Sequence, residues 1–207
     1  MSAAIKTIFW DIGGVLLTNG WDSRQRARIL TALGVDLPAY EALHEDANYL
    51  WERGLMTAQD FFTKTVIETH PHLNLSFEQI WSLVCSESKV LHQENFEILA
   101  ALKDSGQYRL ATLNNESKEL NAYRLDTFGL RQYFNYFICS GYVHEMKPLP
   151  DIYRAAIDIS GLAPESALFI DDKQENCEAA RSFGMNAIPF ESPAQLRASL
   201  TQRGIAV

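Results

Sequence analysis

The stretch IKTIFWDIGGVLLTNG, residues 5–20, decides the fold expected for this chain. Residues 7–10 are apolar or β-branched and favour an extended backbone. The run ends at Asp11, and the pair Gly13-Gly14 then removes the side chains that would hinder a sharp turn or a close approach to a ligand. Open α/β sheets place their chemistry at the carboxyl ends of their strands. The stretch therefore predicts a strand that delivers a carboxylate to a functional edge.

Helix and strand patterns alternate over the second half of the sequence. The expected strands are 108–113, 133–140, 167–170 and 187–190, and the expected helices are 91–104, 120–128, 151–160, 175–183 and 193–202. This alternation predicts a parallel sheet with right-handed crossovers. The fold class we expect is α/β, a Rossmann-like parallel sheet with helices on both faces.

A block without strands separates the first two strands by about 100 residues, far more than an ordinary crossover needs. Helical periodicity covers residues 21–33, 38–51, 57–69 and 76–85. Thr57 and Ser76 precede two of these helices and are expected as N-caps. We therefore expect a core of residues 1–16 and 88–207 and, inserted into it, a helical-bundle cap. The name cap segment is used below for residues 17–87.

Composition sets bounds on the class of protein. The chain has 207 residues and is 47% hydrophobic, which is enough to build a hydrophobic core. Its formal net charge of −8 argues against nucleic acid or an anionic membrane as a partner, because either would need a basic surface. The three cysteines, Cys85, Cys139 and Cys177, follow no metal-binding spacing and are expected to be reduced and packed. No signal peptide or membrane helix is evident, so we expect a cytoplasmic protein. The oligomeric state is left open.

Polar residues follow three of the predicted strands. These are Asp11, the pair Asn114-Asn115 and the pair Asp171-Asp172. In a parallel sheet they converge on one edge. The second aspartate of the last pair could cap the following helix, but two adjacent carboxylates facing Asp11 favour a hard cation such as Mg²⁺, and the two roles are compatible.

Lys147 lies in the segment HEMKPLPDIY, residues 144–153, after the third predicted strand. Most lysines are solvent-exposed, and this one on its own would be interpreted in that way. Beside the polar strand ends it is instead the local positive charge that an acidic protein needs to bind phosphate.

The order of these motifs resembles the haloacid dehalogenase superfamily, in particular its phosphatase-like branch with a small helical cap. The matching segments are FWDIGGVLL (9–17), LATLNNES (110–117), MKPLPDIY (146–153) and LFIDDKQENCEAARSFGM (168–185). The resemblance implies a Mg²⁺-dependent hydrolase that acts on a small phosphomonoester, such as a sugar phosphate.

The resemblance also assigns site residues. Asp11 would be the nucleophile that becomes an aspartyl phosphate, and Lys147 would hold both Asp11 and the phosphoryl oxygens. The metal ligands would be Asp11, the backbone carbonyl of Gly13, Asp171 and, directly or through water, Asp172.

Phosphate would further be held by backbone N–H groups of Ile12, Gly13 and Asn115 and by the side chain of Asn114. The chain departs from the family pattern at two of these positions. Gly13 stands where efficient phosphatases have an Asp that serves as general acid and base, and Asn114 stands where Ser or Thr is usual. General acid–base help is worth ~10²–10⁴-fold in rate, so turnover could be slow.

Two cap residues, Glu52 and His44, could supply the missing proton. Two other functions stay open on this sequence: a catalytically weakened protein that binds phosphate or a metabolite, and a metal-independent 2-haloacid dehalogenase, against which the doubled Asp171-Asp172 argues.

Overall fold

The computed structural model describes residues 4–207, so the first three residues of the predicted core segment 1–16 lie outside the described range. Its centre is a five-stranded sheet in the order β3-β2-β1-β4-β5, in which every neighbouring pair is parallel. The strands are β1 (Thr7–Trp10), β2 (Arg109–Asn114), β3 (Tyr136–Cys139), β4 (Ala167–Asp171) and β5 (Asn186–Pro189). The expected Rossmann-like fold is confirmed, with the opening stretch of sequence as the central strand.

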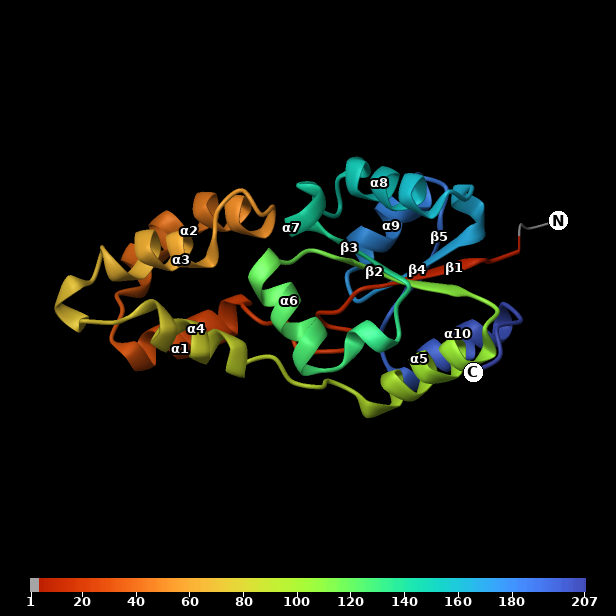
Figure 1. Cartoon of the computed structure of the whole chain (residues 1–207), viewed down its shortest axis with the longest axis horizontal. Helices are drawn as coiled ribbons and strands as arrows, with labels where there is room; N and C mark the ends of the chain where they lie inside the picture. Colours follow the sequence, from red (N-terminus) through yellow and green to blue (C-terminus); the bar gives the residue numbers. More distant parts are fainter. Residues whose placement is uncertain (1–3) are drawn as a thin grey trace.

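Helices cover both faces of this sheet (Figure 1). The helices of the core are α5 (Gln93–Ser105), α6 (Lys118–Thr127), α7 (Ser140–Val143), α8 (Pro150–Ser160), α9 (Gln174–Ser182) and α10 (Pro193–Gln202), with short 3₁₀ turns at Leu130–Gln132 and Pro164–Ser166. Of these, α7 and the 3₁₀ turns were not predicted, because segments of three or four residues carry too little periodicity to be recognised.

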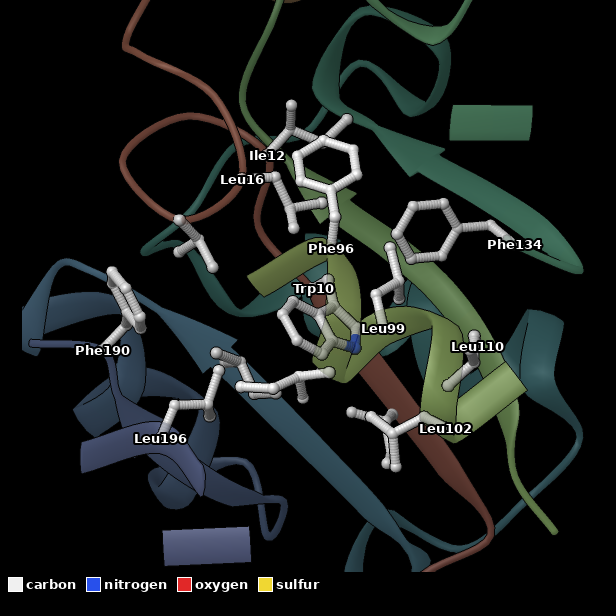
Figure 2. Close-up of a cluster of buried hydrophobic side chains, with 14 of the residues drawn as sticks. Trp10, Ile12, Leu16, Phe96, Leu99, Leu102, Leu110, Phe134, Phe190 and Leu196 are labelled. Atoms are coloured by element: carbon white, nitrogen blue, oxygen red, sulfur yellow. The ribbon is translucent and has the colours of Figure 1, made fainter. Parts of the chain in front are cut away.

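The side chains of β1 alternate between the two faces, as strand geometry requires. Ile8 and Trp10 pack with α5 and α10 in the cluster drawn in Figure 2. Phe9 packs in the opposite direction, against Tyr153 of α8 and Ala180 of α9. Both faces of the strand are fully buried, which accounts for its unbroken apolar sequence.

The cap segment has a hydrophobic cluster of its own. Its elements are α1 (Ser23–Leu33), α2 (Leu37–Glu52), α3 (Ala58–Phe62), the π-helix Thr63–Ile67, the 3₁₀ turn Pro71–Leu73 and α4 (Phe77–Ser86). In Figure 1 these helices lie at one end of the molecule, at the far end from both chain termini. Leu120 of α6 joins their cluster, so the core and the cap segment share a packed boundary.

Side-chain caps set the starts of the cap helices. Thr57 and Ser76 accept hydrogen bonds from Asp60 N and Gln79 N, as predicted, and Asp22 forms a full capping box with Gln25 at the start of α1. The helix expected at 57–69 is in fact α3 followed by the π-helix, in which the Thr65 hydroxyl donates to the Phe61 carbonyl. The periodicity of the sequence does not distinguish this wider turn from an α-helix.

Two chain segments connect the cap segment to the core, and they run side by side. Thr18 N donates to the Lys89 carbonyl at 2.9 Å, and Leu91 N donates to the Leu16 carbonyl at 3.0 Å. The Thr18 hydroxyl also donates to the Glu87 carbonyl. The two connections thus form one hydrogen-bonded hinge.

The three cysteines are free and buried, as expected from the sequence. Among the described residues, no helix has the length and apolarity to cross a bilayer.

Candidate active site

A cavity of about 350 Å³ lies between the carboxyl edge of the sheet and the cap segment. It is lined from the core by residues that include Asp11, Gly13, Asn115, Glu116, Arg124, Lys147 and Asp172, and from the cap segment by Asn19, Trp21, Asp22, Arg26, Trp51 and Glu52. The polar strand ends therefore meet at one edge, as the parallel sheet requires. A larger hollow of about 720 Å³ lies at the opposite edge, near Lys6 and Tyr108, and its lining contains no carboxylate.

Lys147 joins two of the predicted aspartates. Its ammonium nitrogen Nζ lies 3.0 Å from Asp11 Oδ2 and 2.6 Å from Asp171 Oδ2. All three side chains are buried, and Asp171 is inaccessible to solvent. The ammonium group of Lys147 thus fixes the positions of two carboxylates at the ends of neighbouring strands.

Asp171 and Asp172 have different environments. Asp171 accepts hydrogen bonds from Lys147 Nζ, from the backbone N–H of Lys173 and from the amide of Asn176, which reaches both carboxylate oxygens. Asp172 lines the cavity, whereas Asp171 does not. The second aspartate is therefore the one of the pair that lines the cavity, and the first one anchors Lys147.

Asp172 does not cap the following helix. The N-cap of α9 is Lys173, whose side chain makes no capping hydrogen bond. The prediction that Asp172 caps this helix is therefore wrong, and the Asp172 carboxylate is free of that role.

Gly14 makes room for Asp172. Its φ is +74°, a backbone conformation that favours glycine, and a Cβ atom at this position would lie 2.2 Å from Asp172 Oδ2. The glycine pair suggested a close approach of the backbone to a ligand; in the structure, the backbone at Gly14 closely approaches the Asp172 carboxylate.

The protonation of the cluster follows from burial and from the neighbouring charges. Burial raises the pKa of Asp11 to about 8; Lys147 opposes this shift, and Asp171 and Asp172 add to it. Burial would also raise the pKa of Asp171, but Lys147 and Asn176 hold it below its usual value. Burial acts against the Lys147 ammonium, yet the two aspartates raise the pKa of Lys147. The cluster thus contains three carboxyl groups and one ammonium group, that of Lys147.

These residues fit a divalent cation. Asp11, Asp171 and Asp172 each offer a carboxylate oxygen, and these three oxygens lie within 4.8 Å of one another. Oxygen ligands are those that Mg²⁺ prefers, and a cation among them would favour the ionised form of Asp11, which burial and the neighbouring carboxylates oppose.

Asn115 fixes the main chain at Lys147. Its side-chain amide donates to the Lys147 carbonyl at 2.8 Å, and its Oδ1 accepts from the Lys147 N–H at 2.9 Å. The sequence had suggested only its backbone N–H as a phosphate donor. Of the other predicted donors, Ile12 N–H donates to Asp11 Oδ1 at 2.8 Å, and Gly13 lines the cavity.

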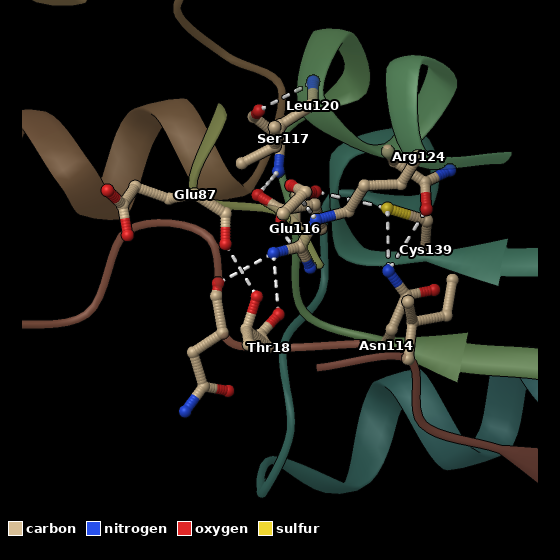
Figure 3. A network of polar contacts seen from close by, with 12 residues as sticks. Thr18, Glu87, Asn114, Glu116, Ser117, Leu120, Arg124 and Cys139 are labelled. Atoms are coloured by element: carbon tan, nitrogen blue, oxygen red, sulfur yellow. Dashed lines mark hydrogen bonds and ion pairs between the residues drawn. The ribbon is translucent and has the colours of Figure 1, made fainter. Parts of the chain in front are cut away.

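Asn114 is absent from the lining of the cavity, so its position does not support a role in binding phosphate. Its amide nitrogen donates to Asn121 Oδ1 at 3.1 Å and lies 3.8 Å from Cys139 Sγ (Figure 3). The reason is strand alternation. Leu113 packs on the same face of the sheet as Phe9, and the next residue therefore points to the opposite face.

Arg124 of α6 is a site residue that the sequence did not reveal. Its buried guanidinium donates to the carbonyls of Thr18 and Asn19 at 2.9 and 2.6 Å and to Ser88 Oγ at 3.1 Å, so it holds both connections of the hinge (Figure 3). It also lies 3.1 Å from Glu116 Oε2. One arginine thus ties the site loop after β2 to both connections of the cap segment.

The space beside Gly13 is already occupied. A Cβ atom at this position would lie 3.0 Å from Asn19 Oδ1 and 3.7 Å from Arg124 Nη1. The location where the resembling phosphatases have an acidic side chain therefore holds an amide and a guanidinium in this chain.

The two suggested cap residues lie in different places. Glu52, at the end of α2, lines the cavity. His44 instead packs against the rings of Tyr40 and Phe61, at 5.3 and 6.1 Å between centroids, and does not line the cavity. Burial and then Arg26 lower the pKa of His44 to about 4. The suggestion of His44 as a proton donor is therefore wrong.

These features define a hydrolase-type α/β site, with a carboxylate clamped by lysine at the end of the central strand. A family model of haloacid dehalogenase-like hydrolases matches residues 5–184, and the chain belongs to this family.

Curated relatives match part of the chain. A phosphoglycolate phosphatase of Aquifex aeolicus is 34% identical over 86 residues, which are 42% of this chain and 40% of that protein. A chloroplast flavin mononucleotide hydrolase of Arabidopsis thaliana is 29% identical over 113 residues, which are 50% and 46% of the two chains. The chain thus spans less than half the length of these relatives.

A solved structure of a family enzyme from Bacteroides thetaiotaomicron is similar to nearly the whole chain. The TM-score is 0.77 at 21% identity, over 91% of this chain and 95% of the other. Another structure of that enzyme, in complex with magnesium and inorganic phosphate, has a TM-score of 0.73 at 22% identity with the same coverage. At this identity the likeness concerns the fold.

Proposed function

We propose that this hydrolase is a Mg²⁺-dependent phosphatase that acts on a small phosphomonoester, such as a sugar phosphate, through an aspartyl phosphate on Asp11. The observation that carries the proposal is the cluster in which Lys147 Nζ lies within 3.0 Å of Asp11 and 2.6 Å of Asp171, with Asp172 facing the same cavity. The relatives named as phosphatases and the magnesium–phosphate complex of the Bacteroides enzyme support it. The cavity volume of about 350 Å³ suits a small ligand.

In this proposal Asp11 Oδ attacks phosphorus, the bond to the leaving oxygen breaks, and water later cleaves the aspartyl phosphate. Lys147 neutralises Asp11 and binds a phosphoryl oxygen. Backbone N–H groups of Ile12, Gly13 and Asn115 complete the phosphate site.

Mg²⁺ would be held by Asp11, Asp172, the Gly13 carbonyl and, directly or through water, Asp171, and when bound it supplies positive charge to the transferred phosphoryl group. The free, buried cysteines agree with a reducing compartment, and we propose a cytoplasmic location on that basis.

The test is turnover of a panel of phosphorylated metabolites with Mg²⁺ and after chelation by EDTA. Asp11→Asn should abolish phosphate release, whereas Asp104→Asn, at an exposed carboxylate, should leave it unchanged. Phosphate release that survives Asp11→Asn would refute the mechanism. Release of chloride from a 2-haloacid in the presence of EDTA would favour a dehalogenase instead.

A weakened phosphate-binding protein is the second candidate, because Gly13 offers no acid and the Asn114 amide is turned away from the cavity. It predicts that beryllofluoride raises the melting temperature only with Mg²⁺, and that no member of the panel is hydrolysed.

A further inference from the structure

We propose that Glu52 of the cap segment is the general acid and base of this hydrolase, in place of the side chain that Gly13 lacks. The proposal rests on the proposed function and extends it to the proton transfers. Because Asn19 and Arg124 fill the space beside Gly13, no acid can act from that direction, and the proton must come from another wall of the cavity.

Glu52 has a carboxylate oxygen available for this role. Oε1 accepts from Asn48 Nδ2 at 3.1 Å, whereas the other oxygen has no hydrogen-bond partner within residues 4–207. The side chain lines the same cavity as Asp11.

Glu116 and Asp22 also line the cavity but are committed to other contacts. Glu116 accepts from Ser117 N at 3.0 Å through one oxygen and pairs with Arg124 at 3.1 Å through the other. Asp22 accepts from two backbone N–H groups through Oδ1 as the N-cap of α1, whereas Glu52 accepts a single bond, from a side-chain amide. Of these three carboxylates, Glu52 is the one most free to exchange a proton with a substrate.

The end of α2 is docked firmly on the core, which sets the position of Glu52. Ser140 Oγ donates to the Glu52 carbonyl at 2.7 Å. The neighbouring Arg53 forms a reciprocal pair with His144: its Nε donates to the His144 carbonyl, and its carbonyl oxygen lies 2.6 Å from His144 Nδ1. A Cβ atom at Gly54, where φ is +64°, would lie 2.1 Å from the Gly141 carbonyl oxygen, so the backbones touch. None of these contacts involves the Glu52 side chain, so they should survive its substitution.

The environment of Glu52 favours its protonated form. Burial raises the pKa of Glu52, against the opposing effects of Asn48, Lys173 and Arg26. Glu116 faces the same cavity, and the two carboxyls repel each other when both are ionised. A carboxyl that keeps its proton to higher pH than usual is the form required for the first step.

The proton transfers balance over the two steps. As the bond between phosphorus and the leaving oxygen breaks, the Glu52 carboxyl gives its proton to that oxygen, and an alcohol departs. The Glu52 carboxylate then takes a proton from the water that attacks phosphorus. The bond between phosphorus and Asp11 breaks, and inorganic phosphate is released. The Asp11 carboxylate and the protonated Glu52 carboxyl are thereby regenerated.

The test compares Glu52→Gln with Glu45→Gln, an exposed glutamate on the same helix, on two substrates. Ethyl phosphate has a poor leaving group that needs a proton, whereas p-nitrophenolate leaves without one. Glu52→Gln should lower kcat/KM for ethyl phosphate ~10²–10⁴-fold while leaving kcat/KM for p-nitrophenyl phosphate nearly unchanged. With p-nitrophenyl phosphate the variant should release one equivalent of nitrophenol in a burst, followed by a slow steady state, because the attack of water on the phosphorus of the aspartyl phosphate then lacks its base.

Equal losses of kcat/KM on both substrates would indicate a structural role and overturn the proposal, and so would a Glu52→Gln enzyme as active as the Glu45→Gln control on ethyl phosphate. If Glu52→Gln does not fold, Glu52→Asp serves, since it keeps an acid at shorter reach and should lose activity on ethyl phosphate selectively. A wild-type chain without turnover overturns the proposed function and this inference together, whereas an active wild type that depends on Asp11 but not on Glu52 overturns this inference alone.

Discussion

Removing the Arg124 guanidinium should loosen the hinge and destabilise the whole chain. In Arg124→Met, the buried Glu116 loses its ion-pair partner, and the carbonyls of Thr18 and Asn19 lose their donor. Breaking a buried pair by removal of one partner costs about 3–5 kcal/mol. For a domain of this size, each kcal/mol lowers the melting temperature by about 2–4 °C, so we expect a fall of roughly 6–20 °C.

The melting temperature is measured by calorimetry at pH 8. A second variant separates the cost of the unpaired Glu116 charge from the cost of the lost Arg124 contacts. Glu116→Gln added to Arg124→Met removes the unpaired carboxylate and should recover part of the lost stability. A melting temperature within about 2 °C of the wild type, or a double variant less stable than Arg124→Met, would contradict the argument that a buried charge is being compensated.

Two further predictions concern Gly14 and Glu116. Gly14→Ala should cost about 1–2 kcal/mol for its left-handed backbone and should also displace Asp172, so Mg²⁺ should no longer raise the melting temperature. Gly106→Ala is the matched control, because its φ is +62° but a Cβ atom there meets nothing within 4 Å, and its Mg²⁺ response should match that of the wild type. Burial raises the pKa of Glu116 to about 7, so the folded state holds a proton that the unfolded state has already released. The stability of the wild type relative to Glu116→Gln should therefore be greatest below about pH 4.5 and should be lost as the pH rises to about 7; parallel stability curves over this range would exclude the shift.

The sequence predicted the parts of the fold that rest on a repeated pattern. Alternation of strand and helix predicted the parallel sheet, and the rule that strand ends meet at one edge predicted that Asp11 and the Asp171-Asp172 pair lie together. Lys147, which follows no strand directly, was added as the positive charge that a phosphate site among carboxylates needs. The positions of the three aspartates follow from local periodicity together with one topological rule.

Side-chain direction at the site was the feature hardest to predict from the sequence. Alternation along β2 places the Asn114 side chain on the face opposite that of Leu113. The sequence does not show at which residue this alternation ends, so the direction of the last side chain of a strand is hard to predict. The division of roles between Asp171 and Asp172 depends on contacts with Gly14 and Asn176, which are distant in the sequence or across a turn.

Arg124 could not be recognised from the sequence, because an arginine on an amphipathic helix is usually solvent-exposed. It is buried here only because two connections separated by about 70 residues of chain pass beside α6 and present carbonyl groups to it.

The central position of β1 has a consequence for how the chain is made. Thr7 pairs with Arg109 on one side and with Ala167 on the other, so the strand synthesised first must wait for loops of about 100 and about 160 residues before both edges are satisfied. The cap segment, with contacts that are closer in the sequence, can order while β1 is still unpaired. A nascent chain interrupted before β4 would expose a flat apolar edge open to pairing with another chain, and we expect such a truncated product to aggregate.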